Sequence, residues 1–281
     1  MSESERRMKF IPKEIRENVN VSKVPAGREF LRLIAEILGA ILIVYLALGF
    51  ALDYIAPRIS TDMEAAIGRI FSAKFADNKY PKTEEQVQGI LNELLKRSSL
   101  PKFDYAAHIT PSKEINALAF PAGNIIVYSA LLKEVKSRNE LAMVLAHELG
   151  HFAHRDHLRG LGRGFVLLVL SSVTLGTDST VSKFIGNILS GAEMKFSQAQ
   201  EKAADTYALG LLYKTYNNAA GAADFYQKMA AKEKIPRIFY FFATHPYIKD
   251  RIELINGIIK EKGYAVGFLT PIDFPELAKD K

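Results

Sequence analysis

Apolar and polar residues recur with helical periods along most of this chain, but one stretch near its start is apolar on every side. Between Ile37 and Leu52 the sequence ILGAILIVYLALGFAL contains no charged residue, and an extension back to Leu33 adds only Glu36. A helix of about 20 apolar residues just spans the hydrocarbon core of a bilayer. A soluble amphipathic helix would show a polar stripe, which this segment lacks. We therefore predict one transmembrane helix over residues 33–53, with a buried core helix as the alternative.

The residues on either side of this segment indicate its orientation. The preceding basic residues are Arg6, Arg7, Lys9, Lys13, Arg16, Lys23, Arg28 and Arg32, and those in the comparable stretch after it are Arg58, Arg69, Lys74, Lys79 and Lys82. This excess predicts a cytoplasmic segment over residues 1–32 and an extracytoplasmic remainder, on the periplasmic side in a Gram-negative cell. The long polar region ahead of the apolar run favours a retained signal anchor over a cleaved signal peptide.

Helical periodicity returns after the apolar segment and dominates the rest of the chain. Thr83 with Gln86, and Ser137 with Glu140, have the spacing of capping boxes. The pattern predicts helices over residues 62–76, 83–97, 137–157, 197–213, 219–232 and 248–260. We assign residues 54–100 to a helical linker region and residues 101–281 to the main domain.

Short β-favouring segments occupy only the stretch from Phe103 to Tyr128. DYAAHIT, INALAF and NIIVY are separated by Pro111, Pro121 and Gly123, which predicts a small antiparallel sheet. The expected fold class is therefore α+β and mainly helical. Two further apolar runs, within residues 160–192, are each too short to span a bilayer. We expect a helical hairpin there that leans on the membrane or covers a cleft.

Composition excludes several kinds of function. The net charge is +6, but the Lys and Arg residues are spread evenly and no basic run is interleaved with aromatic residues, so we expect no nucleic-acid partner. The chain has no cysteine, which excludes disulfides, cysteine-ligated zinc and thiol catalysis.

The segment AMVLAHELGHFAHRDH contains four of the six histidines of the chain. In a helix, His147 and His151 of its HExxH pattern project from one face, one turn apart, where two imidazoles can bind one zinc ion. Glu148 lies beside that face, where a carboxylate can accept the proton of a water molecule activated by the metal. The alternative is a purely structural pair of histidines.

Catalytic zinc needs a third protein ligand, and the sequence offers two candidates. His157 has the third-ligand spacing of the metzincin pattern HExxHxxGxxH, but His154 stands where the pattern has glycine. The other candidate is Glu201 in EKAAD, where Asp205 lies one helical turn away on the same face. One of these carboxylates could bind the metal while the other accepts a hydrogen bond from a ligand histidine.

Four motifs in order resemble those of the membrane-linked gluzincin peptidases, the family that includes the CAAX prenyl protease and the heat-shock protease HtpX. They are NALAFPAGNIIVYSALL, HELGH, EKAAD and THPYIKDR, and the resemblance covers about residues 103–258. It implies a zincin-type catalytic domain. By position it implies one Zn²⁺ per chain bound by His147, His151 and Glu201, catalytic roles for Glu148 and His245, and supporting roles for Asp205 and Arg251.

The resemblance also implies how substrate binds. In this family the strand before the active-site helix is an open edge on which the substrate pairs as an added β-strand, and here that strand is 124–128. The implied substrate-binding residues are Asn116, Ala117, Gly123, Asn124, Ile125 and Ile126. The expected function is zinc-dependent endoproteolysis of membrane-associated or misfolded proteins in protein quality control. The alternative is a metal-binding chaperone or assembly factor with little proteolytic activity.

Overall fold

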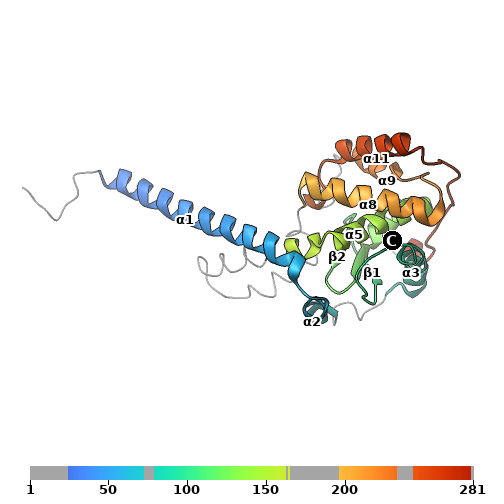
Figure 1. Ribbon diagram of the computed structural model, residues 1–281, viewed down its shortest axis with the longest axis horizontal. Helices are drawn as coiled ribbons and strands as arrows, with labels where there is room; N and C mark the ends of the chain where they lie inside the picture. Colours follow the sequence, from blue (N-terminus) through green and yellow to red (C-terminus); the bar gives the residue numbers. More distant parts are fainter. Residues whose placement is uncertain (1–24, 73–78, 163, 165–195, 233–242, 280–281) are drawn as a thin grey trace, which may run out of the picture. The chain divides into compact units, whose positions relative to one another are not determined.

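The computed structural model describes residues 25–72, 79–162, 164, 196–232 and 243–279 (Figure 1). Backbone contacts divide the chain into two compact units, residues 1–46 and 47–281. The apolar hairpin expected over residues 160–192 lies almost entirely outside the described residues.

The first unit is dominated by helix α1, Ala26–Ile55, which continues into the start of the second unit. Leu31 and Ile43 are 67% and 68% exposed, and none of the residues of α1 is buried. The described helix Ala26–Arg58 has the length and composition of a membrane-spanning helix or of a signal sequence. Its apolar residues therefore do not form the core of the described chain, and the buried-core alternative is wrong.

The second unit is mainly helical, as its sequence pattern predicts. Its helices are η1 (Ala56–Arg58), α2 (Thr61–Ser72), α3 (Pro81–Leu95), α4 (Ser129–Glu134), α5 (Arg138–Ala153), α8 (Gln198–Tyr216), α9 (Asp224–Ala231), α11 (Ile248–Lys262) and η4 (Leu277–Lys279). Residues 156–162 are also helical.

The starts of two of these helices test the capping-box predictions. Helix α3 begins at Pro81, and the Thr83 backbone N–H donates to the Glu276 carboxylate, so the expected Thr83 cap is wrong. Proline suits the first helical position because that position needs no N–H donor. At α5 the Ser137 hydroxyl accepts the Glu140 N–H, but the Glu140 carboxylate accepts the N–H of Lys136 instead of that of Ser137, so only half of the expected capping box forms. Helix α5 ends at Ala153, four residues earlier than expected.

The sheet has three strands: β1 (Ala106–Thr110), β2 (Ala117–Phe120) and β3 (Asn124–Tyr128). Their order is β1-β3-β2, with β1 parallel and β2 antiparallel to β3. The expected antiparallel sheet is thus wrong, because β1 joins the far side of the β2–β3 hairpin in parallel register. The prediction of β3 as an open edge is also wrong, since both its sides are paired, and β2 is the edge strand next to it.

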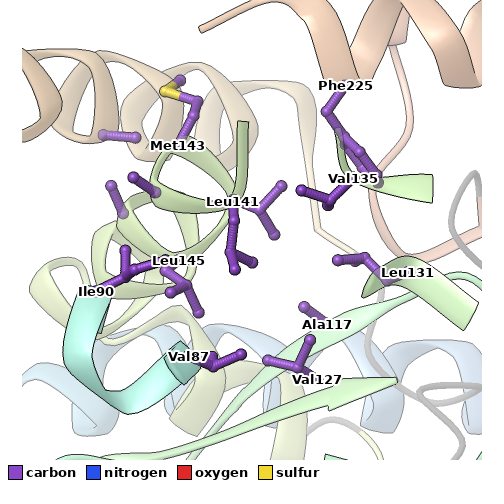
Figure 2. Packing of buried hydrophobic residues seen from close by; sticks show 14 of the residues in the cluster. Val87, Ile90, Ala117, Val127, Leu131, Val135, Leu141, Met143, Leu145 and Phe225 are labelled. Atoms are coloured by element: carbon purple, nitrogen blue, oxygen red, sulfur yellow. The ribbon is translucent and has the colours of Figure 1, made fainter. Parts of the chain in front are cut away.

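The main core lies between the sheet and the helices that cover it. Figure 2 shows Val87 of α3 and Leu145 of α5 together with Val127 of β3. Helix α3, assigned from the sequence to a linker, thus belongs to the same core as α5. Every residue of α5 from Asn139 to Phe152 is buried. Polar groups on such a helix must find their partners inside the protein.

Helices α5 and α8 cross at very short range. A Cβ atom on Gly150 would lie 2.8 Å from both Cα and O of Ala204, closer than real contacts allow. Glycine at position 150 and alanine at position 204 therefore let the two backbones approach. Helix α8 also packs against α11, so that α5, α8 and α11 lie side by side (Figure 1).

We expect Gly150→Ala to lower the free energy of unfolding by about 1–3 kcal/mol, because the added methyl group overpacks the crossing. The variant should also lose zinc, since α8 must shift. Gly210→Ala is the matched control, because a Cβ atom on Gly210 of α8 would meet no atom of the described residues within 4 Å. The control should gain about 0.5–1 kcal/mol from helix propensity. Denaturation and elemental analysis of the purified variants test this, and equal behaviour of the two would contradict it.

Candidate metal centre

Four buried side chains from three parts of the chain converge on one point. His147 and His151 come from α5, Glu201 from α8, and His245 from the segment before α11, and one ligand atom of each lies within 4.8 Å of the others. Nε2 of His147 is 3.1 Å from Nε2 of His151 and 3.5 Å from Oε2 of Glu201. Nδ1 of His245 is 3.3 Å from Nε2 of His147 and 3.1 Å from Oε1 of Glu201.

These distances fit a tetrahedral zinc site. Zinc binds imidazole nitrogen and carboxylate oxygen at about 2.0–2.2 Å, so two tetrahedral ligands lie about 3.3 Å apart. Charge fits as well. Glu148, Asp156, Glu201 and Asp205 are buried acids at the cluster, and Arg251 is the buried base beside them, so the site carries an excess of negative charge that a divalent cation reduces. The residues present therefore suit one Zn²⁺, with His147, His151 and Glu201 as its protein ligands.

Asp205 and Arg251 support two of these ligands. Oδ1 of Asp205 is 2.9 Å from Nδ1 of His147, which directs Nε2 of that ring to the metal position. Arg251 donates from Nε and Nη2 to both Asp205 oxygens at 2.7 and 2.8 Å, and its Nη1 is 2.6 Å from Oε2 of Glu201. The guanidinium lies over the Tyr226 ring at 4.4 Å. Arg251 thus joins α11 to two acidic residues of α8.

The charge of Arg251 sets the protonation of its neighbours. Burial and the Arg251 charge lower the pKa of His147 to about 3, so this ring is neutral, as a metal ligand must be. Burial alone would raise the pKa of Glu201, but the charges of Arg251 and His245 hold it well below its usual range. Glu201 is therefore ionised.

Asp156, which is not among the residues expected from the sequence, supports the second histidine. Its Oδ2 is 3.1 Å from Nδ1 of His151, while its Oδ1 accepts from Gln200 at 2.7 Å and from Arg159 at 3.0 Å. The His151 ring also stacks on Phe196, with centroids 3.9 Å apart. Asp156 follows the end of α5 rather than lying at helical spacing from His151. Only the turn at residues 154–155 brings it back to the ring, so helical spacing could not identify it.

Glu148 lies beside the cluster, in a dry environment. It is 2% exposed, and burial raises the pKa of its carboxyl group. The backbone N–H of Ala119 on β2 donates to this carboxylate, whereas its Oε2 has no hydrogen-bond partner among the described residues. Oε1 is 3.8 Å from Nε2 of His245. A buried carboxylate oxygen without a partner can accept a proton from a water molecule.

The alternative third ligand, His157, does not join the cluster. His154, at the glycine position of the metzincin pattern, keeps a right-handed conformation with φ of −96°, and the left-handed turn falls one residue later, on Arg155, with φ of 58°. After that turn, however, Nε2 of His157 is 2.8 Å from Oε1 of Glu64, and Nδ1 is 3.3 Å from the carbonyl oxygen of His151. The metzincin alternative is wrong.

The residues expected to bind substrate fall into two groups. Asn116 and Ala117 lie at the start of the edge strand β2. Gly123 lies in the β2–β3 turn, and Asn124, Ile125 and Ile126 lie in the central strand β3. The backbone of β3 is used on both sides, so it cannot pair with a further strand. Ala119, a residue of β2 outside both groups, donates its backbone N–H to Glu148.

Two histidines of an HExxH helix and a glutamate from a second helix define a zinc metallopeptidase of the gluzincin type. The sequence profile of peptidase family M48 matches residues 81–259. The chain belongs to this family of peptidases.

Several relatives are similar to parts of the chain. The beta-barrel assembly-enhancing protease of Yersinia pestis is 25% identical over 210 residues, 69% of this chain and 43% of the relative. The mitochondrial metalloendopeptidase OMA1 of Schizosaccharomyces pombe is 27% identical over 65% of this chain and 55% of its own. Metalloprotease LoiP of Escherichia coli is 31% identical over 54% of this chain and 62% of its own. The matches thus span about half of each relative.

We expect Glu201→Gln to abolish stoichiometric zinc binding, because an amide is a poor zinc ligand beside Arg251. His157→Gln should retain zinc, weakened about 10-fold at most. Elemental analysis of both purified variants, with chelator competition for the second, makes the comparison. Retention of zinc by Glu201→Gln together with its loss from His157→Gln would overturn the ligand assignment.

Proposed function

We propose that this chain is a zinc metalloendopeptidase that cleaves membrane-associated or misfolded proteins, as part of protein quality control. The observation that carries the catalytic part of this proposal is Glu148, buried beside the metal ligands with one oxygen that has no hydrogen-bond partner among the described residues. A carboxylate in this position, beside the ligands but not one of them, favours hydrolysis over the alternative of a metal-binding chaperone or assembly factor with little proteolytic activity.

In the proposed reaction, zinc, when bound, supplies the Lewis acid that acidifies water and polarises the scissile carbonyl group. Glu148 takes a proton from the attacking water and passes it to the leaving amine. Its raised pKa makes the carboxylate a better proton acceptor than an exposed glutamate. Asp205 and Asp156 keep the two rings of the HExxH helix oriented, and Arg251 keeps Asp205 and Glu201 in place.

His245 occupies the fourth corner of the ligand cluster. We propose that this arrangement is a resting state in which His245 holds the position that water and substrate need. Thr244 is 3.4 Å from Asn116 Oδ1, so the same segment touches the start of the edge strand. Withdrawal of His245 would open both the metal position and this end of β2. In the open state its imidazole could stabilise the oxyanion of the substrate.

We propose that substrate adds as a strand to β2 rather than β3. Tyr128 donates its N–H to the Asn116 carbonyl, so even-numbered residues of β2 face β3 in the antiparallel ladder. The backbone groups of Ala117 and Ala119 therefore face away from the sheet, where their carbonyl oxygens can accept hydrogen bonds, while the Ala117 N–H donates to Oδ1 of Asn116 at 3.0 Å. A strand paired there would lie beside Glu148, because Ala119 already donates to that carboxylate. Pairing of this kind uses main-chain groups and suits a peptidase of broad specificity.

The apolar helix supports a membrane location. We propose that residues 33–53 are a single-pass anchor in the lipid bilayer of the cell membrane, with residues 1–32 in the cytoplasm and the catalytic part, within residues 101–281, outside it. The name of the Yersinia pestis relative, beta-barrel assembly-enhancing protease, supports a role in the quality control of envelope proteins. A substrate delivered as an exposed strand would be typical of misfolded proteins.

We expect Glu148→Gln to keep one zinc per chain and to lose cleavage of an unfolded protein by at least about 100-fold, since the amide cannot accept the proton. Glu253→Gln is the matched control, because Glu253 is exposed on α11. Casein degradation and elemental analysis test both variants. Wild-type turnover by zinc-loaded Glu148→Gln would show that the proposed mechanism is wrong.

The proposed orientation can be tested by cysteine labelling, because the chain has no cysteine of its own. An impermeant maleimide should label Lys260→Cys, on the exposed surface of α11, in cells whose outer barrier is opened and whose inner membrane is intact. Ser4→Cys should be labelled only after lysis. The reverse pattern would contradict the orientation, and release of the chain by carbonate would contradict the anchor.

A further inference from the structure

Glu64 is a buried acid outside the metal cluster. It lies on α2, the helix that follows α1 and η1, and is 1% exposed while its neighbours Asp62 and Met63 are exposed. Of the residues of α2 whose burial is described, only Glu64 and Gly68 are buried. They are four residues apart and so share one face of the helix. Helix α2 thus has a narrow buried face with a carboxylate in it.

The Glu64 carboxylate links α2 to the segment that follows the active-site helix. Its Oε1 is 2.8 Å from Nε2 of His157, whose ring is also buried. The other ring nitrogen of His157 is 3.3 Å from the carbonyl oxygen of His151. A continuous chain of contacts therefore runs from α2 through one imidazole to the backbone of a zinc ligand. A carboxylate is costly to bury without such partners.

The same face of α2 also meets the turn between β2 and β3. Ala122 donates its N–H to Oε1 of Glu64 at 3.3 Å. A Cβ atom on Gly68 would lie 2.5 Å from Cβ of Ala122 and 3.0 Å from the carbonyl oxygen of Pro121, so no side chain fits at position 68. Helix α2 therefore packs closely against this turn, and the contact at Gly68 fixes the position of the helix.

Arg155 fixes the start of the same connection. Its Nη1 donates to the carbonyl oxygens of Ala56 and Ile59 at 3.3 and 2.5 Å, and its Nη2 is 3.8 Å from Oε2 of Glu64. The residue adopts φ of 58°, which is uncommon outside glycine. Arg155, in the turn after α5, thus contacts both the η1 turn and the buried carboxylate of α2.

We propose that Glu64 is a positioning residue of the zinc site, which acts through His157 on His151. The consequence is that zinc binding depends on the position of α2, the first α-helix after the apolar segment, relative to His157 and the β2–β3 turn. Its catalytic consequence rests on the endopeptidase function proposed above, whereas its effect on zinc affinity needs no turnover. A failure of the proposed role of Glu64 can therefore be distinguished from a failure of the proposed endopeptidase function.

The first experiment measures zinc loss from the full chain in detergent. Glu64→Gln should speed the removal of zinc by a chelator and raise the zinc dissociation constant about 10-fold, in the range found for groups that orient metal ligands. Asp62→Asn, an exposed acid on the same helix, should behave as wild type. Wild-type zinc affinity in folded Glu64→Gln would overturn the proposal.

The second experiment tests the path through His157. Because Glu64 and His157 act in one chain of contacts, the double variant Glu64→Gln/His157→Gln should hold zinc no less tightly than the weaker single variant. Multiplied effects of the two substitutions would mean that Glu64 acts independently of His157, and would overturn the proposed path. Thermal unfolding of the metal-free variants reports any general loss of stability that a purely structural role would cause.

A third variant leaves Glu64 intact, in case its substitution prevents folding. Gly68→Ala should push α2 away from Ala122 by steric contact and thereby withdraw Glu64 from His157. Alanine favours helix more than glycine does, so α2 itself is not weakened. Faster zinc loss in a folded Gly68→Ala chain is the expected result. Wild-type zinc retention would contradict the dependence on the seating of α2.

Discussion

The close crossing of α5 and α8 is the constraint on which the site depends. Gly150 meets the backbone of Ala204 without a side chain between them. Glu201 and Asp205 flank Ala204 on α8, and His147 and His151 flank Gly150 on α5. The short separation of the two backbones therefore sets how far the carboxylates reach toward the imidazoles. At a wider crossing the imidazoles of α5 and the carboxylates of α8 would be buried without contact, and the desolvation of each would not be compensated.

So many polar groups can be buried because they form hydrogen bonds and ion pairs with one another. Arg251 binds both Asp205 oxygens and lies beside Glu201, so one guanidinium from α11 compensates two carboxylates of α8. Zinc supplies the remaining positive charge when it is bound. Metal binding and packing of α11 against α8 are thus coupled, because each reduces the repulsion that the other would leave.

The arrangement of the sheet connects binding to chemistry. The edge strand β2 touches Glu148 through Ala119, and its Asn116 end touches Thr244, next to His245. On its turn side the same hairpin meets α2 through Ala122. A strand that pairs with β2 would therefore act on residues already in contact with Glu148, with the segment of His245 and with helix α2.

The sequence by itself determined the local features: the long apolar helix, the mainly helical content and the HExxH pair, because helical period and ligand spacing are properties of neighbouring residues. It also identified Glu201 over His157 through motif order, although spacing alone left both open. Only the tertiary structure decided the strand order, the role of Asp156 and the pairing of His157 with Glu64. Strand order depends on which side of a hairpin a third strand joins. The contacts of Asp156 and His157 depend on a turn at Arg155, where no glycine in the sequence indicates a left-handed residue. Such long-range contacts arise from packing, which no local pattern encodes.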